Sequence, residues 1–244
     1  MAQLSFMVTR PPTNVLIGFS IHLFTASGAF WAFLALVAAA ENRFTQMWFW
    51  LGVALLVDGL DGPLARYFQV KTVLPNWSGE LLDCIIDYAT FALIPAFALY
   101  QSGFLEEYAS FMCAALIVCT SAIYYADTRI KSRDNFFIGF PICWNMLVFT
   151  LFVMEPNWYV AFAIVITSAI LTFTPILYVH PVRVVAWRNY TLSIFALWSL
   201  CGAIALYCGY YGLGVPALAK IGIAASGLYL FCVGGVLQYL GKAT

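Results

Sequence analysis

Charged side chains are scarce in this sequence. Asp, Glu, Lys and Arg together make up 9% of its 244 residues, whereas hydrophobic residues make up 64%. In soluble domains the charged fraction is usually about 25%, because a polar surface must cover the core. The composition therefore excludes a water-soluble fold and predicts an integral membrane protein.

Other absences narrow the class further. The formal net charge is zero and no basic run is present, so nothing predicts a nucleic-acid partner. The 7 cysteines form no Cys-x-x-Cys pair, which gives no metal or disulfide signature and favours a role as small apolar fillers. The N-terminus lacks the pattern of a cleaved signal peptide. No long polar stretch separates the apolar runs, so we expect one membrane domain over residues 1–244.

Apolar runs long enough to cross a bilayer as helices recur along the chain. We therefore predict an all-α, polytopic membrane bundle of about eight transmembrane helices. The predicted spans are Val15–Ala40, Gln46–Arg66, Gly79–Gln101, Tyr108–Ala126, Phe137–Met154, Trp158–Val179, Tyr190–Cys208 and Pro216–Leu240. An even number of spans places both termini on the same side of the membrane.

The basic residues predict which side that is, because cytoplasmic loops retain Lys and Arg during insertion. Nine basic residues fall on the side of the termini: Arg10, Arg66, Lys71, Arg129, Lys131, Arg133, Arg183, Arg188 and Lys242. The opposite loops carry the glutamates Glu41, Glu106, Glu107 and Glu155. Arg43 and Lys220 depart from the pattern. Both termini are therefore predicted to be cytoplasmic.

Four aspartates interrupt these apolar segments. Asp58 and Asp61 are three residues apart at the end of the second predicted span, and Asp83 and Asp87 are four apart near the start of the third. Each pair therefore lies on one face of a helix. If the two helices are neighbours joined by residues 67–78, the four carboxylates converge. Ionisable residues within a membrane are costly and normally mark a site or a pathway.

Converging carboxylates cannot all remain ionised without cations. Hard divalent ions such as Mg²⁺ or Mn²⁺ prefer oxygen ligands, and a bridged pair of such ions serves phosphoryl chemistry. Gly62 and Gly79 leave room for a bulky group beside the acids. The planar, charged fork of Arg66 suits a diphosphate or the carbonyls of a base. The residues thus predict a metal site, open to the cytoplasm, for an anionic substrate.

The spacing of these residues resembles the signature of the CDP-alcohol phosphotransferase family. The eight signature positions are Asp58, Asp61, Gly62, Ala65, Arg66, Gly79, Asp83 and Asp87. One departure is the 12-residue segment YFQVKTVLPNWS between Arg66 and Gly79, which is longer than usual for the family. The family's loop geometry therefore cannot be carried over to this segment.

Within that family, His22–Leu36 and Asp134–Asn145 are most similar to bacterial enzymes that join choline to CDP-diacylglycerol. The resemblance implies an inner-membrane phosphatidyltransferase whose active site faces the cytoplasm. It also implies two Mn²⁺ or Mg²⁺ ions, with CMP and phosphatidylcholine as products and the bilayer as the source of the lipid substrate.

The resemblance also assigns roles by position. Asp58, Asp61 and Asp83 would bind the metals, and Asp87 would share a metal and act as the base that accepts the choline hydroxyl proton. The resulting alkoxide would attack the β-phosphorus and displace CMP. The positions expected to line the cytidine and diphosphate are Gly62, Ala65, Arg66 and Gly79. Glu80, which points away from the Asp83–Asp87 face, is expected to have an interfacial or capping role.

Further candidates come from the residues near this site. His22 and Thr25 lie one turn apart near the cytoplasmic end of the first predicted span. A histidine among apolar residues serves either as a hydrogen-bonded packing residue or, because ionisable groups in a membrane span mark sites, as a residue that lines the nucleotide. The basic residues of the loop after the fourth span serve either to orient the protein or to bind the lipid phosphate. These basic residues are Arg129, Lys131 and Arg133.

A quaternary ammonium is recognised by aromatic faces, because it cannot donate hydrogen bonds. The aromatic residues that flank the basic loop, Tyr124, Tyr125 and Trp144, are therefore the choline candidates. In the last predicted span, Gly222, Ser226, Gly227, Gly234 and Gly235 would allow either close packing within one chain or a homodimer.

Two alternatives remain at this point. The acceptor alcohol would be serine, inositol or glycerol phosphate if the choline assignment were wrong. A transporter that carries protons or metal ions through the acidic residues is a different class of function. The clustering of all four aspartates at one membrane edge argues against transport.

Overall fold

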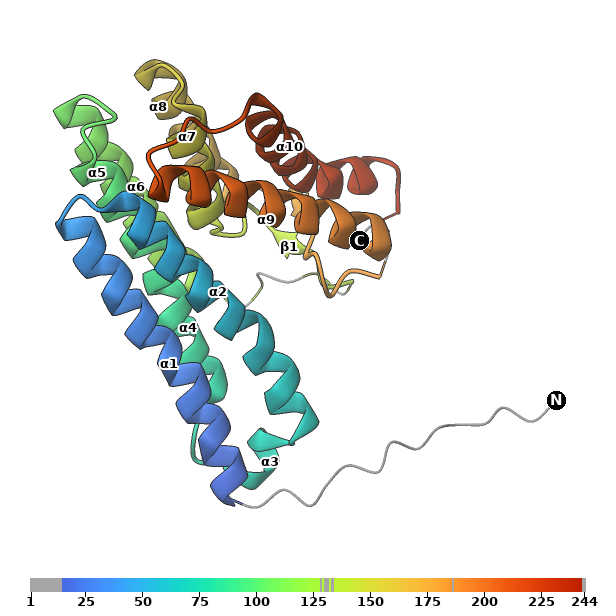
Figure 1. Ribbon diagram of the computed structural model, residues 1–244. Helices are drawn as coiled ribbons and strands as arrows, with labels where there is room; N and C mark the ends of the chain where they lie inside the picture. The colour runs from blue at the N-terminus through green and yellow to red at the C-terminus, as the bar shows by residue number, and fades with distance from the viewer. Residues whose placement is uncertain (1–14, 128, 130–131, 133, 186, 243–244) are drawn as a thin grey trace.

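The protein is built almost entirely from helices (Figure 1). The computed structural model describes residues 15–127, 129, 132, 134–185 and 187–242. Its α-helices are α1 (Val15–Ala40), α2 (Phe44–Tyr67), α3 (Val70–Val73), α4 (Gly79–Asp87), α5 (Ile94–Gln101), α6 (Glu107–Ala126), α7 (Trp144–Met154), α8 (Trp158–Leu171), α9 (Arg188–Tyr210) and α10 (Ala217–Tyr239). A π-helix, η1 (Tyr88–Leu93), joins α4 to α5, and two short strands, β1 (Phe137–Ile138) and β2 (Leu177–Tyr178), pair in antiparallel fashion.

Six helical segments are long and apolar enough to cross a membrane. They are α1, α2, the continuous α4–η1–α5 segment, α6, α9 and α10, and each matches a predicted span to within two residues at either end. The predicted helical, multi-pass membrane fold is therefore confirmed, whereas the count of eight full-length spans is not.

The bounds of the other two predicted spans, Phe137–Met154 and Trp158–Val179, need correction. α7 begins at Trp144 and has 11 residues, and α8 ends at Leu171 and has 14. Helices of these lengths rise about 17 and 21 Å, which is less than the hydrocarbon core of roughly 30 Å. The remaining residues of both predicted spans form β1, β2 and the turns and loops beside them.

Gly139 explains why α7 does not begin before Trp144. Its φ angle is +78°, in the left-handed region that glycine adopts most easily, and a Cβ atom there would overlap the backbone carbonyl of Thr172. The backbone N–H groups of Gly139 and Phe140 donate to the carbonyls of Ile176 and Leu171 at 2.9 and 3.1 Å. These bonds tie the segment before α7 to the segment after α8.

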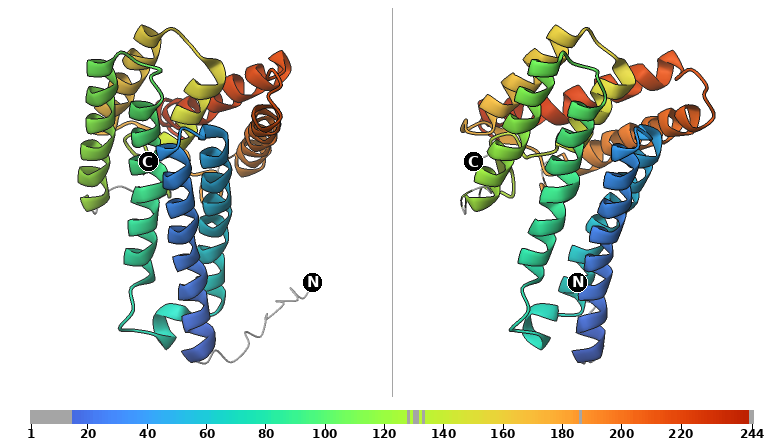
Figure 2. Two further views of the ribbon diagram at one scale, coloured as in Figure 1. Left: turned by 60° about the vertical axis from the view of Figure 1, so that its left-hand side comes forward. Right: turned by 90° about the vertical axis from the view of Figure 1, so that its left-hand side faces the viewer.

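Helix α1 supports both helices that carry the aspartates (Figures 1 and 2). Its inner face is lined by the small buried residues Ala32, Ala35, Ala38 and Ala39, and such residues allow helix backbones to approach closely. Gly28 lies against Ile86 of α4, where a built Cβ would be 3.0 Å from the isoleucine side chain. Because α1 packs on α2 and on α4, it holds these two helices next to each other.

Helices α9 and α10 form a second hairpin, which crosses α1 and α2 at a large angle (Figure 2). The small residues of α10 are largely used inside the chain. Gly222 lies against Cys201 of α9, and Gly234 lies against the backbone of Leu177 in β2. Of the two roles expected for this stripe, close packing within one chain is therefore the one that the contacts support.

Replacing Gly139 by alanine is expected to destabilise the protein. Both the positive φ angle and the overlap with the Thr172 carbonyl oppose a side chain at this position, and a strained backbone residue of this kind costs about 1–3 kcal/mol. The measurement is the thermal unfolding midpoint of purified protein in detergent, taken as the temperature at which half of the protein is no longer monodisperse. The control is Gly52→Ala, because a Cβ built on Gly52 in helix α2 meets no atom within 4 Å beyond its chain neighbours and its own helix backbone. An unchanged midpoint in Gly139→Ala would contradict the role given to this glycine.

Candidate metal centre and active site

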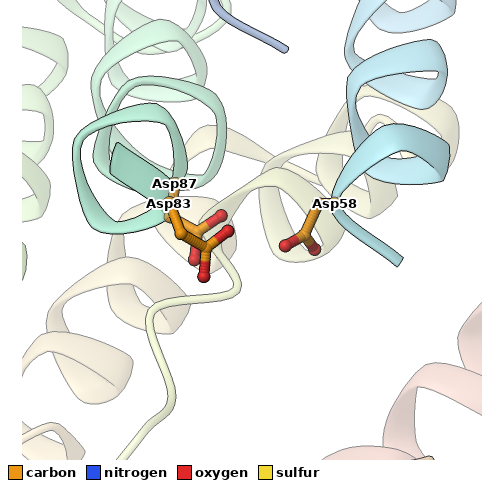
Figure 3. Close-up of side chains that lie close together, drawn as sticks. All are labelled: Asp58, Asp83 and Asp87. Carbon is orange, nitrogen blue, oxygen red and sulfur yellow. The ribbon is translucent and has the colours of Figure 1, made fainter. Parts of the chain in front are cut away.

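Three of the four predicted aspartates come together between α2 and α4 (Figure 3). Asp83 and Asp87 project from α4 toward Asp58 on α2, and one carboxylate oxygen from each lies within 4.8 Å of the others. All three side chains are half-buried. Carboxylates this close repel one another unless a cation lies between them, and an all-oxygen donor set suits a hard divalent ion. The trio is therefore a group that could hold a metal ion.

Asp61 is buried and lies on the side of α2 that faces α1. Its carboxylate interacts with the Thr25 hydroxyl and with the charge of Arg66, and it is 6% exposed. Asp61 also acts electrostatically on Asp58, one turn earlier on the helix. The predicted set of four is thus arranged as a trio with an adjoining fourth carboxylate, and Thr25, predicted as a nucleotide residue, lies beside that fourth one.

The start of α4 fixes where its aspartates point. The Ser78 side chain caps the helix by accepting a hydrogen bond from the Leu81 backbone N–H at 3.1 Å. Glu80 in the first turn lies in solvent and pairs with Lys71 at 3.4 Å. The structure thus places Glu80 away from the trio, and Ser78, not Glu80, provides the cap.

The long segment before α4 packs against α1. It contains α3, from which Val70 and the following Leu74 are buried against Ile21. Gly18 of α1 accommodates this contact, since a Cβ there would be 3.1 Å from Leu74 Cδ1. The extra residues therefore brace the end of the α1–α2 pair.

A π-helix follows immediately after Asp87. Within η1 the backbone N–H of Ile94 reaches back five residues to the Ala89 carbonyl, and Pro95, which has no N–H, comes next. Thr90 adds hydrogen bonds from its hydroxyl to the carbonyls of Ile86 and Asp87 at 3.0 and 3.4 Å. Single π-turns are often found at functional sites, and this one changes the helix register directly after the trio.

The predicted nucleotide residues lie close to each other at this end of the helices. His22 of α1 lies against Gly79, where a built Cβ would be 3.1 Å from the imidazole Cε1, and its buried Nε2 has no hydrogen-bond partner in the described part of the chain. Arg66 folds over Gly62, with its Nη1 3.2 Å from a built Cβ. Ala65 instead packs with the Val70 and Leu74 cluster, which is a structural contact.

Arg183 is a residue that the sequence analysis did not place at the site. It lies in the connection between β2 and α9, and its charge acts on the Asp58 carboxylate. Its position in a loop that the charge pattern assigns to the cytoplasm predicted only an effect on orientation. No local signal would have found it, because the electrostatic interaction joins segments more than 100 residues apart in the sequence.

Arg129, predicted to bind the lipid phosphate or to orient the protein, is paired with a neighbouring aspartate. Its Nε and Nη2 each donate to the Asp127 carboxylate at 2.9 Å, and its backbone N–H donates at 2.8 Å. These bonds lower the pKa of Asp127 to about 2 and raise the pKa of Arg129. The other two basic candidates of this loop, Lys131 and Arg133, lie outside the described residues.

The three aromatic candidates differ in their surroundings. Tyr125 interacts electrostatically with Asp87, Asp58 and Asp83, so its hydroxyl lies near the trio. Its ring meets that of Tyr88 edge to face, with the centroids 6.3 Å apart.

The other two candidates are buried. The Tyr124 hydroxyl has no hydrogen-bond partner among the described residues. Trp144 is fully buried, donates from its indole N–H to Ser121 at 3.0 Å and packs on Phe140. Of the three, Tyr125 is thus the one that the structure brings to the acids.

Comparison with known proteins gives a consistent set of relatives. No protein-family model matches the chain. It is 59% identical over 231 residues to a phosphatidylcholine synthase of Brucella melitensis, a match that covers 95% of this chain and 82% of the relative. The phosphatidylcholine synthase of Agrobacterium fabrum is 53% identical over 234 residues, 96% of each chain. That of Pseudomonas aeruginosa is 34% identical over 223 residues, covering 91% of this chain and 93% of the relative.

If the trio binds a divalent ion, Asp83→Asn is expected to lower the affinity for Mn²⁺ by at least about tenfold, because it removes one charged ligand. Binding is measured on purified protein by the loss of the free Mn²⁺ electron paramagnetic resonance signal. The matched control is Glu80→Gln, which removes an acid from the same helix but outside the trio. Equal Mn²⁺ affinity in the two variants would count against a metal site at this position.

Proposed function

The chain belongs to the phosphatidylcholine synthases, and from that premise we propose that it transfers the phosphatidyl group of CDP-diacylglycerol to choline and releases CMP. The structural observation that supports this reaction is the carboxylate trio of Asp58, Asp83 and Asp87. A cluster of oxygen ligands that could hold a metal is the arrangement that the transfer of a highly charged phosphoryl group requires.

We propose that the trio and the adjoining Asp61 together bind two divalent ions, either Mn²⁺ or Mg²⁺. Such ions would supply the positive charge that offsets the diphosphate and the departing CMP. Asp87 would accept the proton of the choline hydroxyl on a carboxylate oxygen. A bond then forms between the choline oxygen and the β-phosphorus as the bond from that phosphorus to the CMP oxygen breaks.

The groups around the trio support a binding mode for the nucleotide and its phosphates. Gly62 and Gly79 would let the substrate approach the backbone, while Arg66 and Arg183 would each offer a positive charge to the phosphates. His22 has an unpartnered, buried ring nitrogen next to Gly79, which a polar group of the bound nucleotide would satisfy.

We further propose that choline binds beside Tyr125. The ring of Tyr125 lies near the trio and is joined edge to face by Tyr88, so both rings can present aromatic surface to a quaternary ammonium. Asp87 directly precedes Tyr88 in the chain and interacts electrostatically with Tyr125, so a choline bound here would have its hydroxyl within reach of the proposed base. Tyr124 and Trp144 would then support the fold around this pocket.

The proposed orientation has both termini and the trio on the cytoplasmic side of the bacterial inner membrane. The loop charges support it. We propose eight crossings, in which α7 and α8 are completed by the non-helical segments that adjoin them. A homodimer is not part of the proposal, because Gly222 and Gly234 pack within the chain.

Replacing Asp87 by asparagine is expected to lower the rate of CMP release by about 100-fold or more, because the proposed base and a metal ligand are lost together. The assay uses purified protein, CDP-diacylglycerol and Mn²⁺, with choline, serine, inositol and glycerol phosphate supplied separately. Glu80→Gln is expected to keep full activity. CMP release that depends on serine, inositol or glycerol phosphate, and not on choline, would overturn the acceptor. Mn²⁺ transport into liposomes without CMP release would favour a transporter.

Tyr125→Leu is expected to raise the KM for choline by about tenfold, since it removes an aromatic face worth up to roughly 2 kcal/mol at a desolvated site. The KM for CDP-diacylglycerol should change little. The matched control is Tyr108→Leu, which alters a tyrosine that is 86% exposed at the far end of the same helix, α6. An unchanged KM for choline in Tyr125→Leu would place the ammonium elsewhere.

A further inference from the structure

A cavity lies at the opposite end of α2 from the carboxylate trio. Its volume is about 370 Å³, within the range of about 300–1,000 Å³ that is common for ligand sites. It is a partly open cavity, lined by the start of α2, the end of α7, the end of α9 with the loop that follows, and the start of α10. Trp48, which lines it, precedes Asp58 by ten residues of helix, a rise of about 15 Å. The cavity is thus separate from the proposed active site.

Aromatic side chains form one wall of this cavity. The Trp48 ring meets those of Phe149 and Phe152 edge to face, with centroid separations of 5.3 and 5.6 Å. Trp48 is 6% exposed, and its indole N–H has no hydrogen-bond partner in the part of the chain that the structure describes. A wall of this kind attracts a quaternary ammonium, and the N–H requires an oxygen acceptor.

Two opposite charges also line the cavity without pairing with each other. Glu155 and Lys220 are both lining residues, and neither forms an ion pair among the described residues. Arg43, the other basic residue that departs from the loop-charge pattern, lines an adjoining cavity but is paired with Glu41. Lys220 is therefore a half-buried cation whose charge is not offset by a carboxylate of the described chain.

Both charges are placed against the dipoles of their own helices. Lys220 lies in the first turn of α10, where the helix dipole favours an anion, and Glu155 caps the end of α7, where it favours a cation. Glu155 also has a φ angle of +46°, a conformation for which glycine is the usual residue at a helix C-terminus. A ligand with an anion near Lys220 and a cation near Glu155 would relieve both unfavourable placements.

Exposed tyrosines beside the cavity are consistent with a position at the depth of lipid headgroups. Tyr210 and Tyr211 at the end of α9 are exposed, and tyrosines are enriched where a membrane meets water. A ligand that reaches this cavity from the bilayer would therefore present its headgroup there.

We propose that the cavity binds the zwitterionic headgroup of a phospholipid. The phosphodiester would lie at Lys220 and the N-terminal end of α10, and the ammonium would lie against Glu155 and the ring of Phe152. This site is independent of the transferase reaction, since its charges and its aromatic wall are at the other end of the helices.

The test is photocrosslinking of the full-length protein in nanodiscs with phosphatidylcholine that carries a diazirine next to the headgroup. Crosslinked peptides are mapped by mass spectrometry, so labelling at this cavity is distinguished from labelling near the trio. We expect crosslinks in residues 149–158 and 206–220. Lys220→Gln and Glu155→Gln should each reduce them about tenfold, a loss typical of one charge-assisted contact.

Controls separate folding effects from loss of the site. Lys220→Arg keeps the charge and should retain labelling, and Lys242→Gln removes a lysine beyond the far end of α10 and should not reduce it. The thermal unfolding midpoint of each variant shows whether the protein is folded. Labelling of these peptides that is unchanged in both Lys220→Gln and Glu155→Gln, or no labelling there at all, would overturn the proposal.

Competition identifies the ligand chemistry. Unlabelled phosphatidylcholine should displace the probe, whereas phosphatidylglycerol, which lacks the ammonium, should compete at least about tenfold more weakly. Inorganic phosphate and free choline should not compete at millimolar concentration. Equal competition by phosphatidylglycerol would show a simple phosphate site. Displacement by phosphate or by choline alone would show a small-ion site. Each of these three results would contradict recognition of the zwitterion.

Discussion

The mutual repulsion of carboxylates across the gap between α2 and α4 is the constraint on which the rest of the structure depends. Asp58, Asp83 and Asp87 approach to within 4.8 Å while half-buried, so the fold must hold these two helices together against an unfavourable electrostatic interaction. The small residues of α1 allow that close packing on both partners. Divalent ions would turn the same repulsion into attraction, which links metal binding to the stability of this part of the bundle.

The pairing of the four aspartates could be predicted from the sequence, because it depends on the spacing of residues within each helix. Spacings of three and four residues placed Asp58 with Asp61 and Asp83 with Asp87, and the polar segment between them implied neighbouring helices. The structure brings three of these carboxylates into one cluster and turns Asp61 toward α1. That difference comes from the contact of Asp61 with Thr25, which belongs to another helix and has no counterpart in the spacing.

The second half of the chain could be predicted less well, because its structure depends on contacts between distant segments. α7 and α8 have the apolar composition of membrane spans, but the bonds from Gly139 to Ile176 and from Phe140 to the last residue of α8 replace helix at their ends. Arg183, in the loop before α9, acts electrostatically on Asp58, and its neighbours in the sequence give no sign of this. Both features follow from tertiary structure, which hydropathy does not report.

The central claim is that the carboxylates of α2 and α4 converge on divalent ions, and X-ray diffraction at the manganese absorption edge tests it most directly. Crystals of the full chain grown with Mn²⁺ would be measured on both sides of the edge, and anomalous difference density would locate the ions. We expect two peaks within coordination distance of the oxygens of Asp58, Asp83 and Asp87, at about 2.0–2.6 Å. Density at another position, or none near these aspartates under conditions that support CMP release, would contradict the account.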